Sequence, residues 1–253
     1  MDWSPGYREQ PPSAGLLPSV ACLWARVAGP GAGAVATVLP DACVDLIWEQ
    51  GRGVFVAGPD TGAVPSVSPP GTVFAALRFA PGAAGPALGL PMSELLNLRV
   101  DAADLGTGPG AELARALPGS LAPARALAVL ARMAGALTAE GSADALAAHA
   151  ARLLRQPGAR AEGIAERLDV SERQLRRRCQ AAVGYGPATL RRVLRFRRFV
   201  SWADAGAPGD GLASAAARLG YADQAHLTRE CARLAGLTPA ALLAARQPAA
   251  ARR

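Results

Sequence analysis

Residues 164–187 read IAERLDVSERQLRRRCQAAVGYGP, and residues 215–239 repeat the same pattern as AAARLGYADQAHLTRECARLAGLTP. The two copies match at an offset of 51 residues before the turn, where Ala165 matches Ala216, and at an offset of 52 after it. The second copy therefore contains one additional residue between its two helices. An internal repeat of this kind predicts one supersecondary unit that is used twice.

Each copy has the pattern of a helix-turn-helix. Ser171 and Asp223 stand where a helix N-cap belongs, so their side chains can accept a hydrogen bond from the first helical turn. Gly184 and Gly236 are placed to end the following helices in the left-handed conformation. In each copy a leucine and a cysteine four residues apart give that helix one apolar face.

The helix predicted in the first copy carries Arg173, Arg176 and Arg177 on its outward face. That arrangement is typical of a recognition helix for the DNA major groove, where arginine can bond O6 and N7 of guanine with two donors. Each arginine could instead contact only phosphate, which positions a protein without specifying a sequence. Arg178 lies further round toward the inner face, so we expect a phosphate contact or a structural role for it.

Positive charge is concentrated in the C-terminal part of the chain. Residues 1–151 hold 8 arginines and 12 acidic residues, a net charge of −4, whereas residues 152–253 hold 19 arginines and 8 acidic residues, a net charge of +11. This asymmetry favours a polyanion partner for the C-terminal part alone. A solvated, arginine-rich surface is the alternative interpretation.

The length of 253 residues and the size of the repeat region predict two domains. None of the four cysteines forms a CxxC pair; those of the repeat are expected to be packed thiols, and Cys22 and Cys43 could pair, although nothing requires it. Neither a signal peptide nor an apolar stretch of about 20 residues is visible. We therefore expect a cytoplasmic protein that does not enter the membrane.

The N-terminal part has the pattern of a small β-rich domain, either a barrel or a sandwich. Residues 1–19 are rich in proline and turn formers, and we expect them to lie extended over a surface. Short runs of β-branched and aromatic residues follow, separated by breaks that contain Gly and Pro. These runs predict strands at Val20–Val27, Ala34–Leu39, Val44–Trp48, Val54–Ala57 and Val73–Phe79.

Helical spacing of apolar residues begins after Pro81. It predicts helices at Pro91–Asn97, Gly110–Ala116, Pro123–Leu137 and Ala143–Leu154, with Ser142 as the N-cap of the last and with loops at Gly106–Gly110 and Gly135–Gly141. A further helix at Pro187–Ala203, surrounded by arginine, is expected to separate the two repeat copies by a fixed distance.

The predicted fold is therefore an α+β chain with a β-rich N-terminal domain and an all-α C-terminal domain that holds two helix-turn-helix units. Its predicted parts are a sensor or dimerisation domain at 1–105, a helical connector at 106–155, a DNA-binding domain at 156–246 and a basic tail at 247–253.

Residues 160–246 resemble the AraC/XylS family of bacterial transcription regulators. The resemblance rests on Ile164-Ala165, on Gly184 with Pro187, on Arg195 in the linker helix and on the run GYADQAHLTRE at 220–230. The N-terminal part is similar to a domain of unknown function that is often joined to such regulators. That similarity rests on LPDACVDLI at 39–47, Gly58-Pro59 and RFAPG at 78–82.

The resemblance implies a sequence-specific regulator, either an activator or a repressor, whose two units enter successive major grooves of double-stranded DNA. The implied contact residues are Ser171, Arg173, Gln174, Arg176 and Arg177 in the first copy and Asp223, Gln224, His226 and Arg229 in the second. Gln224 can read adenine through its amide, whereas His226 is more often structural. Arg195 is expected to form an internal ion pair, with Asp169 or Asp204 as its partner.

The resemblance also leaves open a small-molecule effector, RNA polymerase and a second copy of the chain as partners, and it implies no cofactor and no metal. The family usually has an aromatic residue where this chain has a smaller apolar one, so we expect a smaller C-terminal core. These positions are Cys179, Leu190, Leu227, Cys231 and Leu242.

Catalysis finds little support, because the sequence contains only two histidines and offers none for a triad or a metal-binding barrel in the β-rich domain. Asp41, Asp45 and Glu49 are interpreted as turn and strand-end residues, and Cys43 as a packed thiol. We therefore expect no enzymatic activity. The alternative is a small-molecule-binding or enzymatic β domain whose C-terminal helices mediate protein contacts.

Overall fold

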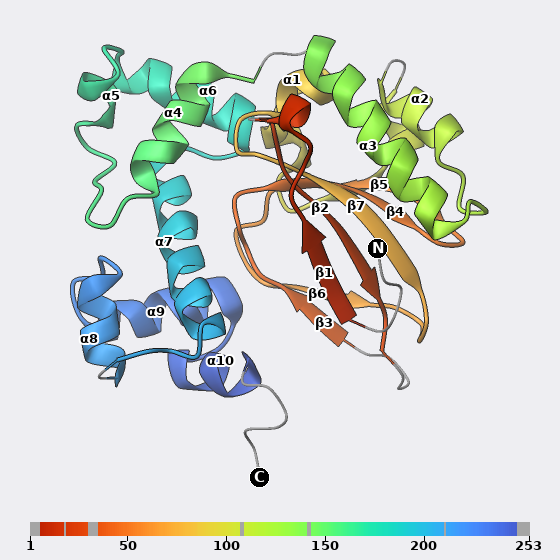
Figure 1. Ribbon diagram of the computed structural model, residues 1–253. Helices are drawn as coiled ribbons and strands as arrows, with labels where there is room; N and C mark the ends of the chain where they lie inside the picture. The colour runs from red at the N-terminus through yellow and green to blue at the C-terminus, as the bar shows by residue number, and fades with distance from the viewer. Residues whose placement is uncertain are drawn as a thin grey trace.

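The computed structural model describes residues 6–17, 19–29, 35–106, 109–140, 143–209 and 211–246. Figure 1 shows an antiparallel sheet covered by helices in the N-terminal part and a group of helices in the C-terminal part. Helix α7 runs through this C-terminal group. The predicted α+β class, β-rich first and helical second, is confirmed. No helix of the described residues is both long enough and apolar enough to cross a membrane.

The central sheet has six antiparallel strands in the order β1-β2-β7-β4-β5-β8, and β3 pairs separately with β6. Within the described residues the large sheet is open, because β1 and β8 form its two edges. The strands are β1 (Gly6–Gln10), β2 (Val20–Val27), β3 (Val35–Val38), β4 (Val44–Glu49), β5 (Gly53–Ala57), β6 (Val64–Val67), β7 (Val73–Phe79) and β8 (Arg99–Asp101).

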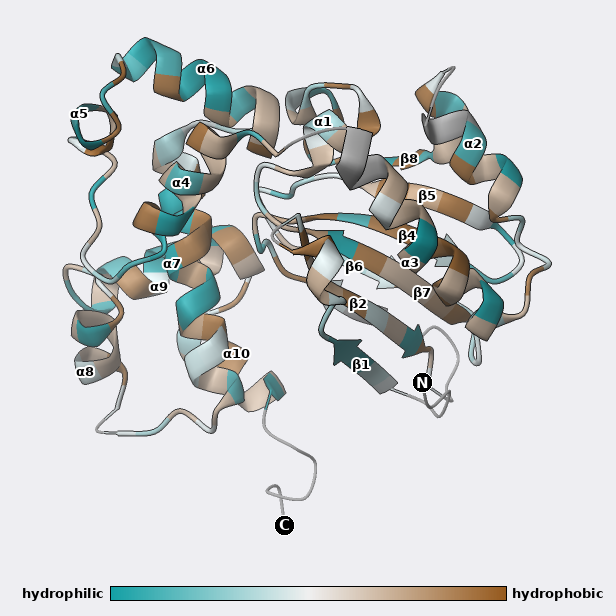
Figure 2. Ribbon diagram, turned by 45° about the horizontal axis from the view of Figure 1, so that its top comes forward, coloured by the Kyte–Doolittle hydropathy of each residue, from teal (hydrophilic) through white to brown (hydrophobic). Residues whose placement is uncertain are grey.

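Both faces of this sheet bury apolar side chains, as the alternation of residues along each strand requires. On one face Leu46, Trp48 and Leu77 belong to the core beneath the helices. On the other face Trp24 and Phe74 belong to a smaller cluster. Figure 2 shows the result as largely brown strands in the middle of the sheet.

All five predicted strands are present, whereas β1, β6 and β8 had no clear signal in the sequence. Residues 6–10, expected to lie over a surface, instead pair with β2 as an edge strand, Tyr7 opposite Arg26. The β3–β6 ribbon lies next to the second face of the sheet, where Arg26 donates hydrogen bonds to Ser66 and Ser68. This ribbon gives that face a partial second layer.

Helices cover the other face of the sheet. They are α1 (Ala84–Leu88), α2 (Pro109–Ala116) and α3 (Pro123–Glu140), with short 3-10 turns at Ala14–Leu16, Met92–Leu95 and Ala102–Leu105. The prediction of a loop at Gly135–Gly141 was wrong up to Glu140, because α3 continues as a helix from Pro123 to Glu140. The predicted helix at Pro91–Asn97 is the 3-10 turn at Met92–Leu95.

The C-terminal helices are α4 (Ala145–Leu154), α5 (Ile164–Arg167), α6 (Glu172–Val183), α7 (Pro187–Asp204), α8 (Gly211–Arg218), α9 (Gln224–Ala235) and α10 (Pro239–Arg246). The N-cap of α4 is Asp144 and not the predicted Ser142, which lies outside the described residues. The predicted tail at 247–253 lies outside them as well.

The predicted connector is divided between two cores. Leu113 of α2, Leu117 directly after it and Leu130 of α3 pack with the sheet. Ala147 and Leu154 of α4 pack instead with the helix-turn-helix units. A C-terminal fragment that begins after α4 would therefore lose part of its own core.

Candidate nucleic-acid interface

The first helix-turn-helix unit consists of α5 and α6, and both ends of α6 are fixed by local chemistry. The side chain of Ser171 accepts a hydrogen bond from the backbone N–H of Gln174 at 3.1 Å, as an N-cap does. At the other end Gly184 has φ 91°, and its N–H donates to the carbonyl of Gln180. The predicted caps of this helix are confirmed.

The two faces of α6 differ sharply in burial. Leu175 and Cys179 are almost completely buried, so the apolar face predicted from their spacing is confirmed. The outward face is exposed and carries Arg173, Gln174, Arg176 and Arg177. Figure 2 shows much of α6 in hydrophilic teal. A shallow hollow of about 670 Å³ lies along this face, lined by these four residues with Ser171 and Gln180.

Arg178 has a structural role. Its guanidinium donates to Asp144, the N-cap of α4, and so ties α6 to the start of α4. Burial alone would raise the pKa of Asp144, but the hydrogen bonds from Arg178 and from the N–H of Ala147 hold it below its ordinary value. We expected either a phosphate contact or a structural role for Arg178, and the ion pair with Asp144 is the structural one.

The second unit, α8 and α9, repeats this construction. The side chain of Asp223 accepts a hydrogen bond from the N–H of His226 at 2.6 Å, and Gly236 ends α9 with φ 68°. Gln224 and Arg229 are exposed on the outward face. Leu227, by contrast, is fully buried.

His226 belongs to an internal network and not to the outward face. It is half-buried, its Nδ1 accepts a hydrogen bond from the N–H of Ala222, and its ring meets that of Tyr221 edge-on. Its Nε2 lies 3.1 Å from Nη2 of Arg195 and 3.5 Å from Oε1 of Glu230. This environment favours the structural interpretation of His226.

Arg195 is the centre of that network and is 5% exposed. Its guanidinium forms two hydrogen bonds with Glu230, which is 6% exposed, and it donates to the carbonyl of Gly220 at 3.2 Å. It also lies 4.6 Å from the centre of the Tyr221 ring. The expected internal ion pair is confirmed and fastens α7 to α9.

The expected partners of Arg195, Asp169 and Asp204, were wrong. Asp204 is exposed at the end of α7 and pairs with Arg246 of α10. Asp169 lies in the turn between α5 and α6 with φ 53°, and the carboxylate that pairs with Arg195 is that of Glu230. A charge buried at the middle of a linker helix requires a partner on the helix that packs there, and that helix is α9.

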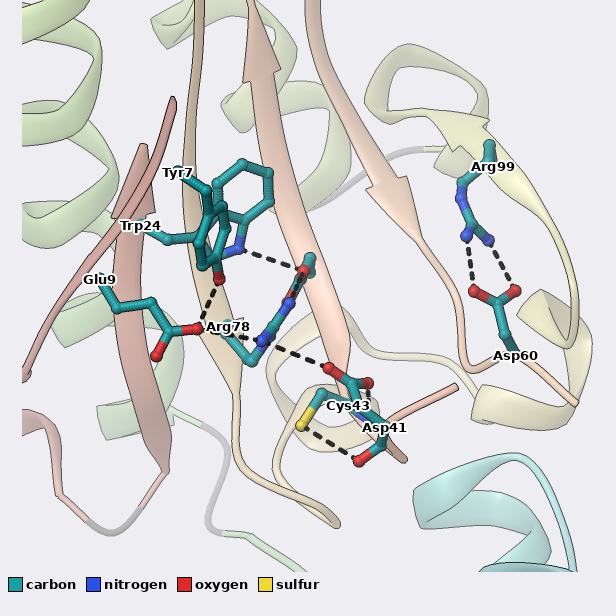
Figure 3. A network of polar contacts seen from close by, with 9 residues as sticks. Tyr7, Glu9, Trp24, Asp41, Cys43, Asp60, Arg78 and Arg99 are labelled. Carbon is teal, nitrogen blue, oxygen red and sulfur yellow. Dashed lines mark hydrogen bonds and ion pairs between the residues drawn. The ribbon is translucent and has the colours of Figure 1, made fainter. Parts of the chain in front are cut away.

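Three acidic residues of the β-rich part surround Arg78, and Figure 3 shows two of them, Glu9 and Asp41, on two sides of its guanidinium. Arg78 makes two hydrogen bonds with Asp45, at 2.8 and 2.9 Å, and ion pairs with Asp41 at 3.3 Å and with Glu9 at 3.5 Å. Asp45 also accepts a hydrogen bond from the indole of Trp24. Asp41 and Asp45 thus have the structural roles that were expected.

All four cysteines are free. Burial raises the pKa of Cys179 to about 11 and that of Cys231 to about 12, and it holds the pKa of Cys43 well above its ordinary value. These thiols therefore remain protonated at neutral pH, which confirms the prediction of packed cysteines in the repeat. No group of His, Cys, Asp and Glu side chains within the described ranges is arranged to hold a metal ion.

Two functional residues were missed from the sequence. Asp144 stands directly before the apolar run of α4, and its preference for N-cap positions was the available signal. Glu230 precedes the buried Cys231 on the inner side of α9, four residues after His226. An acidic residue on the inner side of a helix indicates a buried basic partner.

Residues 164–245 match the model of a helix-turn-helix domain, and residues 8–101 match a domain of unknown function (DUF6597). Two solved structures of ToxT from Vibrio cholerae are similar over most of the chain. For an apo variant from strain SCE256 the identity is 12%, the coverage 89% of this chain and 98% of that one, and the TM-score 0.49. For ToxT from strain O395 the identity is 9%, the coverage 87% of this chain and 96% of that one, and the TM-score 0.47. None of the curated proteins matches the chain.

Proposed function

We propose that this chain, a DNA-binding transcription regulator with a helix-turn-helix domain of the AraC type, reads two successive major grooves with α6 and α9. One observation carries the proposal: two capped helices, each with an exposed polar face, are connected by the 18-residue helix α7, which follows α6 in the chain and packs against α9 at Arg195. At 1.5 Å per residue α7 is about 27 Å long. Successive major grooves on one face of the duplex are about 34 Å apart, a comparable spacing.

In the first unit Arg173, Arg176 and Arg177 are the proposed base readers. They are exposed, and in the described part of the chain their guanidinium groups have no internal partner. Gln174 and Ser171 lie at the N-terminal end of α6, where backbone N–H groups and the helix dipole favour phosphate. Phosphate contacts would supply most of the affinity and make it strongly dependent on salt.

In the second unit Gln224 and Arg229 are the proposed contacts. His226 and Asp223 would act on DNA indirectly. The ring of His226 is held by Arg195, and the side chain of Asp223 caps α9. The two units are therefore unequal, with the first more basic than the second. We propose no catalytic role for the chain, because the carboxylates of Asp41 and Asp45 are both engaged by Arg78.

The test uses the full chain and a fragment recovered from a genomic library by repeated selection. Arg177→Ala should weaken binding to the selected fragment by about 5- to 150-fold, which corresponds to the 1–3 kcal/mol of a bidentate contact with guanine. Binding to random DNA should change much less. Arg132→Ala, an exposed position on α3 outside the helix-turn-helix units, is the matched control.

An equal loss on selected and random DNA would reassign Arg177 to phosphate. Failure to recover any fragment selectively at moderate salt would overturn the proposed function itself.

A further inference from the structure

A cleft of about 560 Å³ lies between the β-rich part and α7. This volume is in the range of small-molecule sites. Its lining comes from both sides of the molecule: from β1, β2 and β7 on one wall, and from α7 and the end of α4 on the other. Any molecule bound there would contact the sheet and the helix that spaces the two reading units.

The wall formed by the sheet is acidic. Glu9 and Asp41 line the cleft, and with Asp45 behind them they surround one arginine, Arg78. Three carboxylates around one guanidinium leave an excess of negative charge. Figure 3 shows Glu9 and Asp41 on two sides of Arg78.

The opposite wall is basic. Arg155, Arg197 and Arg198 line it. Arg198 is held in place, because it donates to the carbonyls of Arg155 and Leu219. Arg197 is half-buried, and over the described residues its guanidinium makes no hydrogen bond and no ion pair. A half-buried guanidinium in a cleft is suited to a carboxylate ligand, which it can bind with two donors.

Between the charged walls the cleft has apolar side chains. Leu17 and Val20 lie on the sheet side, and Leu194 lies on α7. A purely anionic ligand would be repelled by the excess negative charge of the acidic wall, and a purely cationic ligand would leave Arg197 without an anionic partner. A ligand with both charges matches both walls and places its apolar part between them.

We propose that this cleft binds a small zwitterion, with its carboxylate on Arg197 and Arg155, its ammonium group on Glu9 and Asp41, and its apolar part on Leu194: an amino acid or a close derivative. The inference rests on the proposed function in one respect, because the ligand would act as the effector of DNA binding. By joining the sheet to α7, the ligand fixes the position of the linker helix and with it the geometry of α6 and α9.

The test measures binding of matched probes to the full chain by thermal shift and calorimetry. Leucine, phenylalanine and tryptophan are each compared with the amine that lacks the carboxylate and with the acid that lacks the amino group. At least one amino acid should raise Tm in a saturable manner and bind at least tenfold more tightly than its two analogues. Arg197→Gln and Glu9→Gln should each weaken that binding at least tenfold, whereas Arg132→Gln should not change it.

Three results overturn the inference: no amino acid binds, an analogue with one charge binds as tightly as its amino acid, or Arg197→Gln leaves the affinity unchanged. DNA binding is measured separately without the probes. A chain that selects DNA but binds no amino acid overturns only the ligand site. A chain that binds the amino acid with the expected variant effects but selects no DNA supports the site and overturns the regulator function.

Discussion

The buried ion pair between Arg195 and Glu230 permits a quantitative prediction. In the variant Glu230→Gln the guanidinium of Arg195 stays buried and keeps its contacts with the Gly220 carbonyl and the Tyr221 ring. It loses the carboxylate of Glu230, which among the described residues is the only one within hydrogen-bonding distance of it. Removing one member of a buried pair costs about 3–5 kcal/mol, because a charge is left uncompensated. The glutamine oxygen can still accept one hydrogen bond, so we expect a value near the lower limit, about 3 kcal/mol.

For a protein of this size each kcal/mol lowers Tm by about 2–4 °C, so Glu230→Gln should lower Tm by about 6–12 °C. The measurement is thermal unfolding of the full chain by circular dichroism at neutral pH. The matched control is Asp204→Asn, which removes the exposed pair with Arg246, where the aspartate side chain is 47% exposed. An exposed pair contributes about 0–1 kcal/mol, so this control should lower Tm by a few degrees at most.

A double variant tests the physical reason. Arg195→Met with Glu230→Leu removes both charges and retains apolar volume, so it should recover most of the stability lost in Glu230→Gln. If Glu230→Gln costs no more than Asp204→Asn, the charge of Arg195 is not effectively buried and the reasoning is refuted. If the double variant is the least stable of all, the pair contributes net stability beyond the compensation of a buried charge.

Three further predictions concern the contacts of the first unit. Asp144→Ala should lower the stability by about 1–2 kcal/mol at pH 7 through loss of the N-cap. Because the folded pKa of Asp144 lies below its ordinary value, this contribution is present at neutral pH and is lost as the pH falls below about 4. The stability curves of the variant and the native chain should therefore converge in acid. Gly184→Ala should cost clearly more than Gly236→Ala, since both have positive φ but only a Cβ at Gly184 would lie 2.5 Å from Cγ of Pro59; equal losses of Tm would contradict this. Tyr185→Phe should leave the free energy of unfolding in denaturant unchanged or raise it by up to about 1 kcal/mol, because the buried hydroxyl has no hydrogen-bond partner in the described structure, and a loss of more than that would show a hidden partner.

The interdomain contacts have a consequence for control of DNA binding. Gly184 at the end of α6 approaches Pro59 and Met92, and the carbonyl of Arg233 in α9 approaches Gly62. The end of α6 therefore packs against this part of the β-rich domain, and α9 lies near it. If the chain works as proposed, a change at Pro59 or Met92 would be transmitted to α6.

The sequence predicted the parts of this protein that depend on neighbouring residues. The caps at Ser171 and Asp223, the glycine ends at Gly184 and Gly236 and the apolar faces of α6 and α9 all follow from spacings of a few residues. Strand Val20–Val27 was predicted with its observed bounds for the same reason. Local patterns of this kind need no knowledge of what packs against the element.

The tertiary structure alone decided the features that depend on distant residues. β8 has three residues and is a strand only because β5 lies beside it. The partner of Arg195 is Glu230, 35 residues away, because the packing of α9 on α7 places it there. The cleft between Glu9 and Arg197 joins two residues of opposite charge that are almost 190 positions apart. The sequence by itself thus determined two helix-turn-helix units, and the fold determined how they are fastened together and which residues line the cleft between the sheet and α7.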